Sequence, residues 1–181
     1  MSIIYKERPS DSPYVESIIQ GWTASDGSTT RPAECSWHMV FVRWNGNLQS
    51  LVVGPWTTAG VASWGEGAEI LWIKFSLGAF MPHLPTIDLR DAETVLPGAA
   101  SSSFWLKGSA WQVPDYDNVE TFIERLVRAA VLAHDQVVSA ALQGRAPQVP
   151  SRTVRHRFLR TTGLTQSHIC RSNAPNGRRR F

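Results

Sequence analysis

The residues whose types and spacing could do chemistry gather near the end of the sequence, in the stretch SRTVRHRFLRTTGLT at 151–165. This stretch interleaves basic side chains with apolar ones and contains no acid. Arginine can donate two parallel hydrogen bonds to a guanine edge in the major groove, and it can also bind phosphates. The composition therefore favours the binding of an anionic polymer, of which nucleic acid is the usual one.

A helix over this stretch would separate the two kinds of side chain. We expect Ser151 to cap the helix and Gly163 to end it. At about 100° per residue, Val154 and Phe158 fall on one side, which we expect to be buried. The basic residues fall on the opposite side and at its edges, and they are Arg152, Arg155, His156, Arg157 and Arg160. Leu159 is an exception, because it falls among the basic residues.

The charge of the chain is divided along its length. Residues 1–150 hold all 15 acids and 10 of the 18 Lys and Arg, a net charge of −5. Residues 151–181 hold eight arginines and no acid, a net charge of +8, so that the whole chain has +3. Such an asymmetry indicates an anionic partner for the basic end. The alternative is a solvated basic helix followed by a basic, disordered tail at 170–181.

The part before the basic helix is expected to be mainly β, over residues 1–112. Its apolar residues alternate in short runs, and 35–44 is apolar on both faces. The predicted strands are 18–24, 35–44, 48–54, 68–78 and 103–113. Asn45-Gly46 favours a type I′ turn between two of them. Short strands separated by Gly and Pro suggest a sandwich or a barrel.

Helical patterns follow the β-rich part. Asp115 or Asp117 can cap an amphipathic helix of about five turns, which would connect the two halves over 113–133. Asp135 can cap a short second helix at 136–142. The sequence therefore predicts an α+β fold, with the β-rich part first and the helical part after it.

The basic stretch also resembles the recognition helix of the AraC/XylS transcriptional regulators, in which a Ser, an aliphatic residue, an Arg, a Phe and a Gly stand at set spacing. The matching residues are Ser151, Val154, Arg157, Phe158 and Gly163. DQVVSAALQG resembles the first helix of their helix-turn-helix. WIKFSLGAFMPHLP and LRDAETVLP resemble the cupin-like sensing domain of a bacterial branch of the family. The resemblance covers residues 5–169.

The resemblance implies a cytoplasmic bacterial regulator with a cupin-like barrel or sandwich at 1–112 and a partial helix-turn-helix domain at 134–169. The residues that would face bases are Arg152, Arg155 and His156, and those that would hold phosphates are Arg157 and Arg160. The residues that would anchor the helix are Ser151, Val154, Phe158 and Gly163. His156 departs from the family, in which an arginine is more usual at that position. The connection between the two helices is also longer than the roughly 3–4 residues of a standard turn.

The sequence departs further from the family after His168. Family members continue with an apolar linker helix and a second helix-turn-helix, whereas ICRSNAPNGRRRF is polar and broken by Pro175 and Gly177. The resemblance therefore implies a shortened regulator, whose basic helix would lack part of its packing. Short helices are marginal without such support.

Two other functions stay open from the sequence. The chain could be a ligand-sensing or dimerising module that has lost sequence-specific DNA binding. It could also be a metal-dependent cupin-type enzyme, and this hypothesis has the weakest support. A metal-binding cupin needs a cluster of His and Glu, and the β-rich part has only His38 and His83. Cys35 and Cys170 are far apart in the sequence and belong to no metal-binding motif.

These patterns set the expectations for partners and location. We expect no catalytic residue, no metal and no cofactor. The expected partners are DNA, a small-molecule effector and a second copy of the chain. All eight tryptophans precede the helical part, and one or two of them could line an effector pocket. The sequence has neither a signal-peptide pattern nor an apolar run that would span a bilayer, so a cytoplasmic location is expected.

Overall fold

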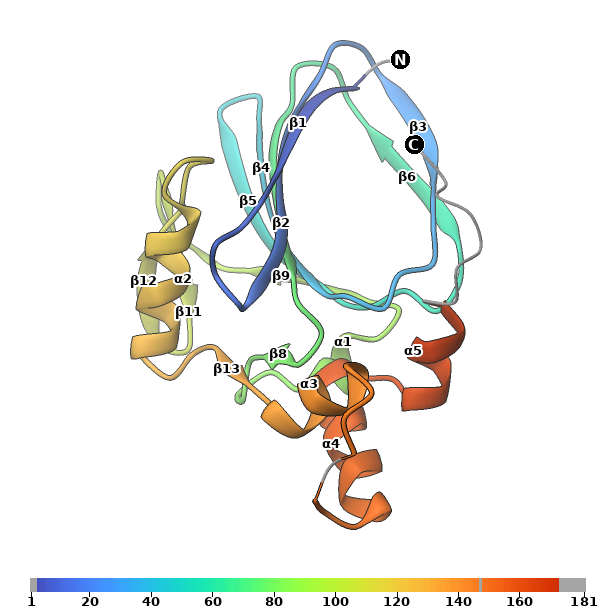
Figure 1. Ribbon diagram of the computed structural model, residues 1–181. Coiled ribbons are helices and arrows are strands. Elements are labelled where there is room, and N and C mark those ends of the chain that lie inside the picture. Colours follow the sequence, from blue (N-terminus) through green and yellow to red (C-terminus); the bar gives the residue numbers. More distant parts are fainter. Residues whose placement is uncertain (1–2, 147, 173–181) are drawn as a thin grey trace.

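A computed structural model describes residues 3–146 and 148–172, without the side chains of 170–172. The fold is α+β, as predicted: strands dominate up to Gln112 and helices follow (Figure 1). Of the predicted tail, residues 170–172 continue a helix, and 173–181 lie outside the described residues. No helix in the described part of the chain is long and apolar enough to cross a bilayer.

The largest sheet has six antiparallel strands in the order β1-β2-β7-β4-β5-β9. Their bounds are β1 Ile3–Pro9, β2 Val15–Thr23, β4 His38–Trp44, β5 Asn47–Val53, β7 Glu69–Phe75 and β9 Glu93–Leu96. Asn45 and Gly46 join β4 to β5 with φ angles of 49° and 75°. Two consecutive positive φ angles are the signature of a type I′ turn, so the predicted hairpin is confirmed.

Both faces of the main sheet are apolar, as the pattern at 35–44 predicted. On one face, Met39 and Ile73 are buried in the largest core cluster together with Phe122 and Leu126 of the following helix. On the other face, Val40 belongs to a smaller cluster that includes strands β5 and β7. Both faces of the main sheet therefore carry buried apolar clusters.

Smaller antiparallel sheets complete the β-rich part. Two of them are pairs: β3 (Gly27–Arg31) with β6 (Gly60–Trp64), and β8 (Ala79–Phe80) with β13 (Ala133–His134). The third is a three-stranded sheet of β10 (Gly98–Ala100), β11 (Ser103–Leu106) and β12 (Ser109–Gln112). The antiparallel pair β3–β6 lies on the opposite side of the main sheet from β11 and β12 (Figure 1). In the described residues these sheets are open, with no ring of paired strands.

The single strand predicted at 103–113 is wrong in one respect, because the chain reverses inside it. Lys107 and Gly108 have φ angles of 51° and 74° and form the turn between β11 and β12. The apolar residues on both sides of the turn look like one run in the sequence. Phe104 and Trp111 are cross-strand partners and both are buried in the core.

The helices are α1 (Thr86–Leu89), α2 (Val119–Arg128), α3 (Gln136–Leu142), α4 (Ser151–Thr162) and α5 (Gln166–Ser172). The predicted connecting helix is shorter than five turns, because α2 has 10 residues and its N-cap is Asn118. Asp115 instead accepts hydrogen bonds from the N–H groups of Asp117 and Asn118 in the preceding turn. The carboxylate of Asp115 therefore stabilises the turn before α2 and does not cap the helix.

Helix α3 forms where the sequence predicted it. Asp135 is its N-cap, and the carboxylate accepts hydrogen bonds from the N–H groups of Val137 (3.0 Å) and Val138 (3.2 Å). The strand β13 precedes this cap and pairs with β8 of the β-rich part. The chain thus leaves the β-rich part through β13 and continues into helices α3, α4 and α5 (Figure 1).

Candidate nucleic-acid interface

The basic helix α4 begins and ends through its backbone. Its N-cap is Pro150, whose carbonyl accepts hydrogen bonds from the N–H groups of Thr153 and Val154. Ser151 is the first helical residue and its side chain does not cap the helix, so the predicted capping role is wrong. Gly163 ends the helix as predicted, with a φ of 70° and an N–H that donates to the carbonyl of Leu159. A left-handed residue at this position is a common helix end.

The inner face of α4 is packed against three different parts of the chain. Phe158 is fully buried, and Val154 packs against the same cluster while remaining partly exposed. The other buried members are Cys35 before β4, Val138 of α3, Leu164 after α4 and Ile169 of α5. The basic helix was expected to lack part of its packing, whereas this cluster supports its inner face. Helix α5 was not predicted, because its short run QSHICRS has little apolar pattern.

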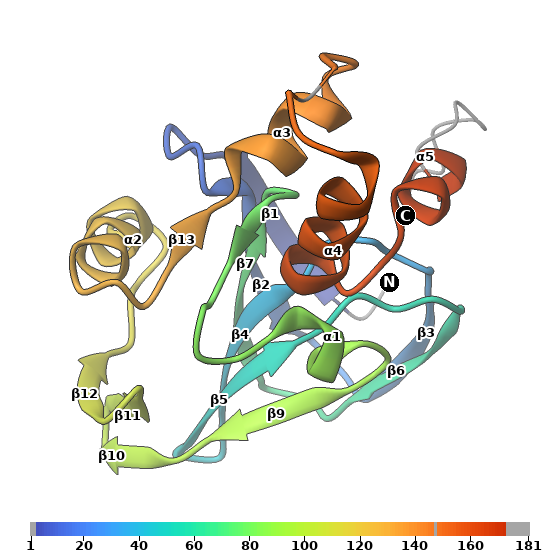
Figure 2. The same ribbon diagram turned by 90° about the horizontal axis from the view of Figure 1, so that it is seen from below.

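The C-terminal end of α4 also contacts α1 of the β-rich part (Figure 2). The Thr86 hydroxyl donates a hydrogen bond of 2.9 Å to the carbonyl of Thr161. Gly163 lies so close to α1 that a Cβ atom on it would be 2.7 Å from the Thr86 carbonyl oxygen. Arg160 lies with its guanidinium carbon 5.2 Å from the centre of the Phe80 ring in β8. The helix is therefore fixed to the β-rich part as well as to α3 and α5.

The outer face of α4 presents basic side chains to solvent. Arg152, Arg155, His156 and Arg160 are all exposed, and α4 contains no acid. Leu159, the exception on the helical wheel, is partly buried. We refer to the four exposed residues Arg152, Arg155, His156 and Arg160 as the basic row. A helix with an anchored inner face and such a row outside can place several cationic donors along a polyanion.

Arg157 differs from the other basic residues predicted to face a ligand. Its Nη1 atom lies 3.2 Å from both carboxylate oxygens of Asp135, the N-cap of α3. The side chain of Asp135 is 10% exposed and that of Arg157 is 42% exposed. The structure therefore places Arg157 at the edge of α4, in an ion pair, and outside the basic row. Nothing in the sequence pairs these two residues, which are 22 positions apart.

No family model, curated protein or solved structure matches this chain.

The histidines considered for a metal site have other surroundings. His38 lies 3.1 Å from Glu34, and Lys74 lies 2.6 Å from the other oxygen of that carboxylate. Burial alone would raise the pKa of Glu34, but the bonds and charges of His38 and Lys74 lower it to about 2. The exposed His83 has its pKa lowered by partial burial and by the charge of Lys107. Among the residues that the structure describes, no three His, Cys, Asp or Glu side chains gather to hold a metal ion.

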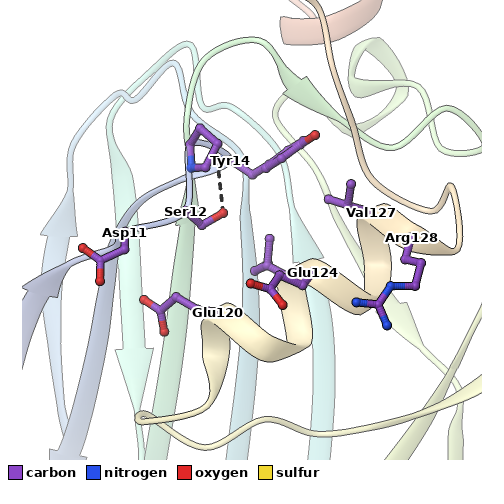
Figure 3. Close-up of a pocket in the computed structure, with 9 residues that line it drawn as sticks. Asp11, Ser12, Tyr14, Glu120, Glu124, Val127 and Arg128 are labelled. Carbon is purple, nitrogen blue, oxygen red and sulfur yellow. Dashed lines mark hydrogen bonds between the residues drawn. The ribbon is translucent and has the colours of Figure 1, made fainter.

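A surface hollow lies between the loop before β2 and helix α2 (Figure 3). Its volume is about 410 Å³, and its lining is Asp11, Ser12, Pro13, Tyr14, Glu120, Ile123, Glu124, Val127 and Arg128. Arg8 donates to both oxygens of Glu120, at 2.6 and 2.9 Å, and Ser10 donates to one of them. The hydrogen bond from Arg8 is the main reason that the pKa of Glu120 falls to about 2. None of the tryptophans expected to line a pocket belongs to this hollow.

Proposed function

We propose that this chain is a DNA-binding regulator of transcription of the AraC type, and that α4 is the helix that reads the major groove. The observation that carries this proposal is the division of α4 into two faces. Phe158 is buried on the inner face, while the basic row is exposed on the outer face. A recognition helix needs both properties, because it must be held rigidly while its side chains reach the bases.

The basic row supplies the chemistry that DNA requires. Arg152 and Arg155 can each donate two hydrogen bonds to a guanine, and Arg160 can hold a phosphate. His156 donates less when it is neutral, and its charge would vary with pH near neutrality. The resemblance to AraC/XylS recognition helices supports the same assignment. Helices α3 and α4 would be the two helices of the motif, joined by a long connection at 143–150.

The proposal extends to the rest of the molecule. The β-rich part would be a cupin-like sensing domain, which would bind a small-molecule effector and shift the population of the DNA-competent arrangement. The protein would act in the bacterial cytoplasm, where a second copy of the chain could bind a neighbouring DNA site. A second candidate function is a ligand-binding module without specific DNA recognition. The hollow beside α2 favours it, because Ile123, Val127 and Tyr14 give that hollow apolar walls.

Fluorescence anisotropy with labelled duplexes tests the proposal. Sequences selected from a random pool by the protein would be compared with unselected DNA at several salt concentrations. We expect Arg152→Ala and Arg155→Ala each to lose about 1–3 kcal/mol of discrimination at one base pair. A contact made to phosphate would instead reduce the slope of log affinity against log salt by roughly 0.9.

Arg43→Ala is the matched control, because Arg43 is an exposed arginine near the C-terminal end of β4. The turn from β4 to β5 lies far from α4 (Figure 1). It should leave both the affinity and the salt slope unchanged. The proposal fails if the wild-type protein selects no sequence, or if Arg43→Ala weakens binding as much as the substitutions in α4.

A further inference from the structure

We infer that Asp135 positions α4, and that Arg157 acts as its partner in this role and not as a phosphate ligand. The inference rests on the proposed function, because it concerns the orientation of the helix that would read DNA. Arg157 was expected to hold a phosphate, and Asp135 was not expected to belong to the site.

Asp135 is first fixed to the β-rich part of the molecule. Its N–H donates a hydrogen bond of 2.8 Å to the carbonyl of Gly78, which lies just before β8. The preceding residue, His134, is paired with Ala79 in the β13–β8 ladder. The backbone of Asp135 therefore cannot move independently of β8.

The carboxylate of Asp135 then makes two kinds of contact at once. One oxygen accepts the N–H groups of Val137 and Val138 and so caps α3. Both oxygens also lie 3.2 Å from Nη1 of Arg157 on α4. The carboxylate of Asp135 is nearly buried, and the backbone of Asp135 is fixed to β8. Arg157 on α4 is therefore held at one place relative to β8. A single residue thus joins the β-rich part, α3 and α4.

This arrangement makes Arg157 a poor ligand for phosphate. Its charge is balanced by a carboxylate at ion-pair distance, and that carboxylate would repel an approaching phosphate. In the described residues, Arg152 and Arg155 form no ion pair. Those two arginines can release counterions from DNA with their full charge, whereas Arg157 cannot.

Asp135→Asn separates the two roles that Arg157 could have. Asparagine caps helices about as well as aspartate, so α3 keeps its N-cap while the ion pair is lost. If Asp135 positions α4, DNA binding should weaken by roughly twofold to fivefold, the range expected for one partly exposed ion pair. If Arg157 is a phosphate ligand, the same substitution frees its charge and removes a repulsive one, so DNA binding should strengthen.

A double-mutant cycle supplies the second measurement. Arg157→Ala should weaken binding to the same extent as Asp135→Asn, and the double variant should be no weaker than either single one. The salt slope should stay at the wild-type value in all three variants. In Arg160→Ala, by contrast, a lost phosphate contact would lower it by roughly 0.9. Additive losses, or a lower slope in Arg157→Ala, would overturn the inference.

Amide hydrogen exchange makes the test independent of DNA binding. Asp135→Asn and Arg157→Ala should each speed exchange in α4 by a similar factor, while the strands of the main sheet should exchange at the wild-type rate. Unchanged exchange in α4 would refute the positioning role. A wild-type protein that ignores DNA but shows these exchange effects would refute the proposed function and leave the positioning role intact. Tighter DNA binding by Asp135→Asn would refute the positioning role and leave the proposed function intact.

Discussion

The contact between α4 and α1 can be tested by replacing one glycine. Gly163 has a φ of 70°, and a Cβ atom at this position would lie 2.7 Å from the Thr86 carbonyl oxygen and 3.1 Å from its carbon. Gly163→Ala therefore combines an unfavourable backbone conformation with a collision against the backbone of α1. The change should destabilise the protein in proportion to how closely the two helices approach in solution.

The magnitude follows from three contributions. An alanine in the left-handed region costs about 1 kcal/mol or slightly more. The collision can be relieved only if α4 and α1 separate, which breaks the hydrogen bond from Thr86 to Thr161 at a cost of about 1 kcal/mol. Loosened packing around the buried Thr162 adds to this. We expect a total loss of about 2–3 kcal/mol in the free energy of unfolding.

Gly144→Ala is the matched control for the backbone term. Gly144 ends α3 with a φ of 73°, but among the described residues no atom beyond its chain neighbours and its own helix backbone lies within 4 Å of the position that its Cβ would take. This variant should lose only about 1 kcal/mol. Urea unfolding followed by circular dichroism measures both losses. Equal losses in the two variants would show that α4 does not rest on α1, and the reasoning about the anchored inner face would be wrong.

Two further predictions concern stability. Phe158→Ala should lower the free energy of unfolding by about 3–5 kcal/mol, because the ring is fully buried. Urea unfolding measures this loss, and a loss below about 1 kcal/mol would contradict the packing of α4. The hydrogen bond from Arg8 lowers the pKa of the Glu120 carboxylate from 4.5 to about 2. The ionised carboxylate therefore stabilises the folded protein fully above pH 4.5, and this stabilisation is lost as the pH falls toward 2. Glu120→Gln should therefore flatten the decline of the urea midpoint between pH 5 and pH 3, and an unchanged pH profile would show that the Arg8–Glu120 pair is not formed.

Local signals in the sequence were enough to predict much of the fold. Asn45-Gly46 specified its turn, Asp135 specified the start of α3, and Gly163 specified the end of α4, because each acts through its own backbone neighbours. Pairs that depend on distant segments were missed. The strand β3, GSTTR, is polar on its exposed positions and becomes a strand through its pairing with β6. Ser151 was misjudged because Pro150 already supplies the backbone geometry of the N-cap.

The candidate site was predictable to a similar extent. The positions of Val154 and Phe158 were sufficient to choose the inner face of α4, and the exposure of Arg152 and Arg155 agrees with that choice. The surroundings of Arg157 were not predictable, because helical spacing says nothing about which residue of another helix lies opposite. The contact with Thr86 is beyond the reach of local patterns for the same reason. Which side of a helix faces inward is local information, whereas what it faces is not.

The distribution of the two main clusters along the chain has a consequence for the order in which the molecule assembles. Among the residues that the structure describes, the largest core cluster has no buried member after Leu132, so these members are all available once that residue has been synthesised. The cluster around Phe158 needs Cys35 at one end and Ile169 at the other, and the Thr86–Thr161 bond spans 75 positions. Chains fold from the N-terminal side during synthesis, so α4 meets a surface that has already formed. The basic row on α4 then takes its place only after the β-rich part has formed.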